Sequence, residues 1–269
     1  MTTKPSSAPW VDEPYKLLPI PQIPKDTKPH SAIHSAAEMA HSHNCLLRGL
    51  NAILQQGPHI PSSAQANHNT QDVKDLLFYV EAWTKTVEHH HHTEETTMFP
   101  AIEKLAGIPG LMSGPMHQHE AFHSGLVELQ EYAVRMQGKV QEYEWRELKG
   151  IIDAFAPALY EHLTAEIGVI LDLEKDCDSQ GLKAVWDEAE RVAKANGNLG
   201  MLYEVFPLVL GTCDKTYEGG NEFPPLPAPI PYAIKYWFGR SHSGAWRFNP
   251  CDFWGKPQPL PMLPENRGK

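Results

Sequence analysis

The sequence contains no long hydrophobic segment, no paired-cysteine motif and no excess of positive charge. No stretch approaches the roughly 18 to 20 apolar residues that a transmembrane helix needs, and the N-terminal segment lacks the apolar core of a secretory signal. The four cysteines, at positions 45, 177, 213 and 251, form no CxxC pair, which favours reduced thiols over a disulfide framework or a zinc site. The formal net charge of −10 argues against a nucleic-acid-binding protein. We therefore expect a cytoplasmic protein that binds neither nucleic acid nor a membrane.

Proline is scarce in the middle of the chain and frequent at both ends. Of the 24 prolines, seven precede Ser31 and ten follow Glu222. Because proline interrupts helices, the middle of the chain is the part that favours long helical segments. This distribution predicts an extended N-terminal arm over residues 1–30 and a helical bundle over residues 31–176. It also predicts an extension over residues 177–269 that is first helical, then irregular and rich in proline and aromatic residues, and that packs on the bundle.

Apolar residues recur at alternating steps of three and four in four segments, which is typical of helices that face a bundle core. Glycine–proline clusters separate the segments, and no alternating strand pattern is present. The fold class that we predict is all-α, an up-down four-helix bundle with an extra helix in the extension. The four segments span residues 31–56, 70–105, 113–137 and 141–175, and the extra helix spans residues 182–196.

Histidine is the most unusual component of the composition, with 15 residues. In each helical segment, ligand-type side chains interrupt the apolar stripe. The unit His-x-x-x-Glu occurs twice in these stripes, and a His and a Glu one turn apart point in the same direction. The set comprises five imidazoles and two carboxylates: His43, His90, Glu94, His119, His123, His162 and Glu166.

Seven such side chains at one level of a bundle core indicate a metal centre. An unpaired carboxylate in an apolar interior costs several kcal/mol, and an unsatisfied imidazole costs about 1 to 3 kcal/mol. A pair of divalent cations removes this cost by taking all seven side chains as ligands. Imidazole with carboxylate suits iron, and less often zinc or manganese. Two ions that share seven protein ligands leave a coordination position open, which is a place for dioxygen.

Four sequence segments resemble the helices of a hemerythrin-like HHE cation-binding domain. They read HNCLLRGLNAI, HHHHTEETTMFP, HQHEAFHSGL and EHLTAEIGVIL, and the resemblance covers residues 31–176. The resemblance implies an up-down four-helix bundle that holds a non-haem di-iron centre. It also implies that the seven side chains named above are the iron ligands, with Glu94 and Glu166 bridging the two irons.

The run of four histidines before Glu94 and Glu95 leaves two ligand registers open. The apolar stripe favours the pair His90/Glu94, and the pair His91/Glu95 is the alternative. We treat the remaining histidines as surface or loop residues. A ferritin-like carboxylate-rich site is disfavoured, since it needs Glu-x-x-His on two helices and only the third segment carries one.

The sequence supports two functions of different classes. One is a non-haem di-iron oxidoreductase, an oxidase or oxygenase that uses dioxygen and acts on a small-molecule substrate. The alternative is a carrier or sensor that binds dioxygen or iron without turnover. The long aromatic and proline-rich extension favours the enzyme, because a simple carrier does not need it and it is able to shape a substrate entrance. A wide channel to the metals would favour the enzyme, and a sealed pocket for a diatomic molecule would favour the carrier.

Overall fold

The structure, a computed structural model, describes residues 10–22, 28–65, 67–195 and 199–266. Within these residues it contains helices and turns, one isolated bridge between Cys251 and Pro257, and no strand. The predicted all-α fold class is therefore confirmed. In the described part of the chain, no helix is both long enough and apolar enough to cross a membrane.

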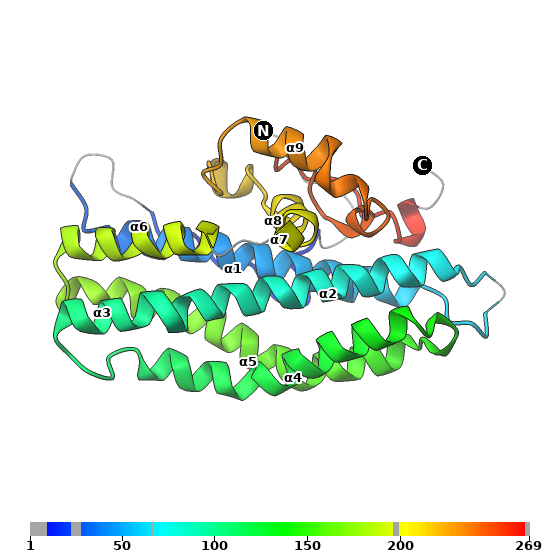
Figure 1. The fold of residues 1–269 in the computed structure, drawn as a ribbon, viewed down its shortest axis with the longest axis horizontal. Helices are drawn as coiled ribbons and strands as arrows, with labels where there is room; N and C mark the ends of the chain where they lie inside the picture. Colours follow the sequence, from blue (N-terminus) through cyan, green and yellow to red (C-terminus); the bar gives the residue numbers. More distant parts are fainter. Residues whose placement is uncertain (1–9, 23–27, 66, 196–198, 267–269) are drawn as a thin grey trace.

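Four long rods lie side by side and form the bundle (Figure 1). The second rod consists of α2, a π-helical turn over Glu94–Met98 and the short helix α3, which begins at Phe99. α1 packs against α2 and α5, and α4 packs against the same two helices, which closes the ring. The bounds are α1 (Ser31–Gln56), α2 (Thr70–Thr93), α3 (Phe99–Ala106), α4 (Ser113–Gln137) and α5 (Trp145–Asp172).

Local signals in the sequence fix several of these helix ends. The side chain of His30 accepts a hydrogen bond from the Ala32 amide at the start of α1, and Asn69 caps α2 in the same way. Gly107 adopts a left-handed conformation with φ 69° and ends α3, which a residue with a Cβ atom does only with strain. These ends set the register in which each helix presents its inner face.

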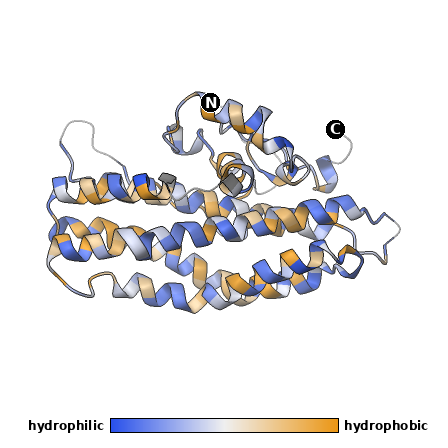
Figure 2. Ribbon diagram, viewed as in Figure 1, coloured by the Kyte–Doolittle hydropathy of each residue, from blue (hydrophilic) through white to orange (hydrophobic). Residues whose placement is uncertain are grey.

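Hydrophobic and hydrophilic residues alternate along the bundle helices, as Figure 2 shows. The inner faces form two separate apolar clusters. The larger includes Leu47, Trp83 and Leu159, and the smaller includes Met39, Phe99 and Ile170. On α1, α5 and the second rod, the ligand-type side chains fall between the part that enters one cluster and the part that enters the other, and on the rod of α4 the smaller cluster is reached by Met112, just before the helix. The polar layer therefore lies between two apolar regions.

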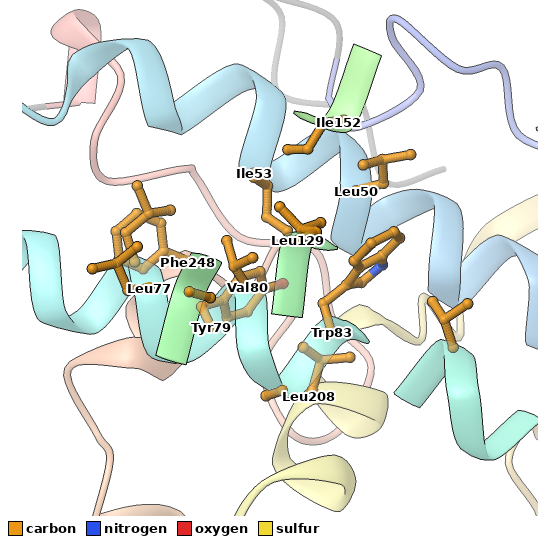
Figure 3. Packing of buried hydrophobic residues seen from close by; sticks show 14 of the residues in the cluster. Leu50, Ile53, Leu77, Tyr79, Val80, Trp83, Leu129, Ile152, Leu208 and Phe248 are labelled. Carbon is orange, nitrogen blue, oxygen red and sulfur yellow. The ribbon is translucent and has the colours of Figure 1, made fainter. Parts of the chain in front are cut away.

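The extension after residue 176 packs on the bundle over α1 and α2 (Figure 1). Phe248 and Leu208 enter the larger core cluster beside residues of α2 (Figure 3). The part that we expected to be irregular also contains a helix, α9, whose first turn carries Pro229 and Pro231, a position that tolerates proline. The helices of the extension are α6 (Ser179–Ala195), α7 (Leu199–Tyr203), α8 (Val205–Thr212) and α9 (Pro229–Tyr236).

Candidate metal centre

Imidazoles and carboxylates from all four rods meet between the two apolar clusters. They form two groups, and in each group the potential ligand atoms lie within 4.8 Å of one another. The first group, which we name site A, consists of His43, His90 and Glu94. The second group, site B, consists of His91, Glu94, His119 and His162.

The two carboxylates connect site A with site B. Glu94 Oε1 lies 3.0 Å from His90 Nε2, and Glu94 Oε2 lies 3.6 Å from His119 Nε2. Glu166 Oε2 lies 3.3 Å from His43 Nε2 and 3.7 Å from His162 Nε2. Each carboxylate thus contacts one imidazole of each site, which is the arrangement that a pair of bridged cations requires.

The structure brings six of the seven predicted ligands together but not His123. That side chain is exposed on α4, because Phe122 occupies the inward position, with its ring centroid 5.0 Å from that of His91 and 5.5 Å from that of His162. His91 supplies the fifth imidazole instead, and its ring centroid lies 4.3 Å from that of His119. His90 and His91 are therefore not alternatives: the first belongs to site A and the second to site B.

From the sequence, His90 and His91 were alternatives because one apolar stripe offers one inward position per turn. α2 packs against both α1 and α4, so two adjacent residues at this seam face different neighbours. The run of four histidines at residues 89–92 was the feature of the sequence that could have indicated two ligands on this helix. Glu95, predicted only as the partner of His91 in the alternative register, contacts His119 instead, and Gln118 was not predicted to contribute. Both roles depend on contacts between helices that no spacing along one helix reveals.

Hydrogen bonds from the outer ring nitrogens orient three of the imidazoles. His43 Nδ1 donates to the carbonyl oxygen of Leu163 at 2.7 Å, and His119 Nδ1 donates to Glu95 Oε1 at 2.6 Å. His162 Nδ1 donates to Gln118 Oε1 at 3.2 Å. Because Nδ1 carries the proton in each ring, Nε2 carries a lone pair and faces the centre, as metal-ligating histidines do.

The Nε2 atoms of His119 and His162 face each other without a proton that could form a hydrogen bond between them. His119 Nε2 and His162 Nε2 lie only 3.1 Å apart, although both rings are protonated on the other nitrogen. Within the described residues, neither oxygen of Glu94 or Glu166 has a hydrogen-bond partner, although all four oxygens are buried. A buried polar atom without a partner is costly, and cations in sites A and B would satisfy all of these atoms. The residues therefore fit a metal pair.

The electrostatics of the centre favour the same conclusion. Burial lowers the pKa of His90 to about 4, and it lowers the pKa of His43 and His91 well below the usual range, with neighbouring imidazoles adding to the effect. Burial raises the pKa of Glu166 to about 7, and burial followed by repulsion from Glu166 raises the pKa of Glu94 well above its usual range. The protein alone thus disfavours every charged form, and a cation is the partner that the carboxylates lack.

Two cavities reach the centre from different sides. An apolar cavity of about 270 Å³ lies between α1, α2 and the extension, and His90 and Glu94 form part of its wall. A second pocket of about 660 Å³, with a more polar lining, is formed by residues of α2, α4 and residues 200–205, among them His91, His119 and the exposed His123. Site A therefore adjoins a cavity with a largely apolar lining, and site B adjoins a pocket with a more polar lining.

A helical bundle that presents imidazoles and bridging carboxylates is the architecture of a cation-binding protein, and comparison with known families gives the same result. The family model described as the hemerythrin HHE cation binding domain matches residues 34–194. The chain belongs to this family. It is also 38% identical over 258 residues to the "Dimeric xanthone biosynthesis cluster protein R11" of Cryptosporiopsis sp. (strain 8999), which covers 95% of this chain and 94% of the relative. No solved structure matches the chain.

Proposed function

We propose that the chain is a non-haem di-iron protein that binds and activates dioxygen, and that it acts as an oxidoreductase on a small molecule. Site A has fewer protein ligands than site B and adjoins the apolar cavity, and this observation carries the proposal. His43, His90 and Glu94 would hold a cation at the end of this cavity, so dioxygen and a substrate would reach it from there.

The residues of the two sites would have different roles in holding the metal ions. His43 and His90 would hold the ion in site A, and His91, His119 and His162 would hold the ion in site B. Glu94 and Glu166 would bridge the two ions and supply the negative charge that offsets theirs. When bound, the iron pair would supply one-electron redox chemistry and an affinity for dioxygen, which no side chain of the chain provides.

The protein environment is largely apolar on the side of site A. Met39, Leu46 and Met98 line the cavity next to His90 and Glu94, and few of the atoms around them would bind water. Ser42 Oγ lies 3.4 Å from His90 Nδ1 and holds that ring on the outer side. Excluding water strengthens the electrostatic interactions of the site and prevents side reactions.

The extension supports the enzyme over the carrier. α6, α8 and the loop over residues 223–226 supply about half of the cavity wall, and the cavity is far larger than a diatomic molecule needs. The name of the relative places that protein in a biosynthesis cluster, which supports a role in converting a small molecule. Dioxygen and a small-molecule substrate are therefore the partners that we propose.

Metal loading followed by exposure to dioxygen tests the proposal. The anaerobic protein is incubated with ferrous iron, the metal per chain is counted by atomic emission, and dioxygen is then admitted while the visible spectrum is followed. We expect two irons per chain and a spectral change that proceeds to a ferric resting state. A change that is reversed when dioxygen is removed would identify a carrier or sensor instead.

The control variants separate the centre from adventitious binding. His119→Ala and Glu166→Ala are expected to lower the iron count, whereas His92→Ala, which removes an exposed histidine of the same run, is expected to leave it at the wild-type value. An iron count that is unaffected by the first two variants would contradict the proposed centre. Loading with zinc or manganese in parallel determines whether iron is preferred.

A further inference from the structure

Three aromatic side chains from different elements surround the apolar cavity. Trp186 comes from α6, Phe206 from α8, and Phe223 from the loop that precedes α9. Phe223 stacks on His41 of α1, with a centroid separation of 5.6 Å and an interplanar angle of 14°, so its orientation is fixed. The sulfur-containing side chains of Met39 and Met98 face the same space, and thioethers pack well against aromatic rings. The walls are therefore suited to a flat, apolar molecule.

Most polar groups in the wall already have partners within the protein. Thr86 Oγ1 donates to the Ala82 carbonyl oxygen at 2.8 Å, and Thr93 Oγ1 donates to the His89 carbonyl oxygen at 2.9 Å. The His89 ring hydrogen-bonds to the backbone of Ala193. His90 and Glu94 form a polar end of the cavity, where site A adjoins it.

The charge of the wall excludes anionic molecules. Among the described residues that line the cavity there is no lysine and no arginine, whereas Glu38 and Glu190 are part of the wall. In the chain without metal, a carboxylate or phosphate that entered would lose its hydration and find no cationic side chain in the wall. A neutral molecule avoids this cost.

We infer that the apolar cavity binds an uncharged aromatic molecule that carries a hydroxyl group. The ring lies among Trp186, Phe206 and Phe223, and the hydroxyl points toward His90 and Glu94. This inference rests on the proposed function for the role of site A, but the aromatic and uncharged character of the ligand follows from the cavity wall alone. The substrate class of the proposed oxidoreductase is accordingly a neutral phenol.

Calorimetric titration of the full chain without added metal tests the inference, because the cavity wall alone then decides which molecules bind and no turnover takes place. The probes are 2-naphthol, which is neutral at pH 7, 2-naphthoate, which has the same ring system with a negative charge, and decahydro-2-naphthol, which has the hydroxyl without the aromatic ring. We expect 2-naphthol to bind at least about 10-fold more tightly than 2-naphthoate and about 3- to 10-fold more tightly than the saturated alcohol. Equal affinities for 2-naphthol and either comparison compound would overturn the inference.

Two variants locate the binding site. Val209→Trp fills the cavity from α8 and is expected to weaken 2-naphthol binding at least about 10-fold, while Val134→Trp, at an exposed position of α4, leaves the affinity unchanged. If Val209→Trp does not fold, as judged by circular dichroism, Phe206→Ala replaces it, with an expected loss of about 3- to 10-fold. Full 2-naphthol affinity in the folded variant would refute the site.

The metal count separates this inference from the proposed function. Two metals per chain without 2-naphthol binding would refute the cavity inference and leave the metal centre in place. Binding of 2-naphthol that is sensitive to Val209→Trp in a chain that takes up no metal would support the cavity and refute the proposed function.

Discussion

His90 and His91 are neighbours on α2 but belong to different halves of the centre. A step of one residue turns the side chain by about 100° around a helix, so one of two adjacent residues faces α1 and the other faces α4. His43 of α1 therefore meets His90, with 3.1 Å between their Nε2 atoms, and His119 of α4 meets His91. Any rotation of α2 would displace ligands of both sites at once.

His91→Ala and His123→Ala form a matched pair that distinguishes the two candidates for the fifth imidazole. We expect His91→Ala to lower the iron count from two toward one, because site B loses one of its three imidazoles. We expect His123→Ala to keep two irons, because that side chain is exposed and belongs to neither site. Atomic emission on both purified variants gives the counts, and the opposite pattern would restore His123 as the ligand.

Glu95 acts on the centre through His119 rather than as a member of either site. Its Oε1 accepts the Nδ1 proton of His119 at 2.6 Å, and its side chain is 39% exposed. Glu95→Gln should therefore weaken metal binding about 10- to 100-fold, while Glu120→Gln, an exposed neighbour of His119, leaves it unchanged. Competition with a chromophoric chelator measures both affinities. Equal affinities of the two variants would show that the hydrogen bond has no such role.

At the scale of elements, close contacts between helices fix the positions of the ligands. α4 approaches α5 at Gly125, where an added Cβ atom would lie 2.6 Å from the Cβ atom of Phe155. α1 approaches α2 in a similar way at Gly49, where an added Cβ atom would lie 2.6 Å from Trp83 Cδ1. Trp83 also donates to the Leu46 carbonyl oxygen at 2.9 Å. These contacts hold the helices at the separation at which the two sites form.

Replacing glycine by alanine at two positions tests this packing. Gly125→Ala is expected to lower the free energy of unfolding by about 1 to 3 kcal/mol, because the new methyl group has no space. Gly150→Ala on α5 is expected to raise it by about 0.5 to 1 kcal/mol, since an added Cβ atom there meets no described atom within 4 Å and alanine favours a helix. Urea denaturation measures both changes, and destabilisation by Gly150→Ala would contradict the argument.

The sequence predicted the helices better than the contacts between them. The expected bounds 31–56 and 113–137 agree with α1 and α4, because a proline–glycine boundary and a steady apolar period are local signals. The same periodicity placed six of the seven predicted ligands at the inner face. It gave the wrong inward position on α4, since Phe122 and His123 are adjacent and only the packing of α4 against α2 and α5 decides which one is buried.

At the scale of the whole molecule, the extension and the bundle share one core. The larger cluster combines bundle residues such as Tyr79 and Val80 with Leu208 and Phe248 of the extension (Figure 3). His242 also stacks on Phe78, with ring centroids 3.8 Å apart. Unfolding of the extension would expose apolar surface of α2, so the two parts should unfold together.

Arg247 connects the extension to the start of α2. It donates to Asp72 Oδ1 at 2.8 Å and to Asp75 Oδ2 at 2.7 Å, and Asp75 is buried. Arg247→Ala is expected to lower the free energy of unfolding by about 1 kcal/mol in a single transition, whereas Arg191→Ala, which removes an exposed ion pair of α6, leaves it nearly unchanged. Tryptophan fluorescence and far-ultraviolet circular dichroism follow the urea transition. Separate midpoints for the two signals would refute a shared core.

Two stretches of the chain form the apolar cavity, and they contribute different kinds of side chain. The side chains that meet at the centre all precede Asp172, while Trp186, Phe206 and Phe223 of the opposite wall all follow it. The candidate metal ligands and the aromatic side of the cavity wall thus lie in separate segments of the chain. Changes after position 177 are free to alter what enters the cavity while the chemistry of the centre stays constant. Chimaeras that exchange this segment between relatives would exchange selectivity and retain a common reactive core.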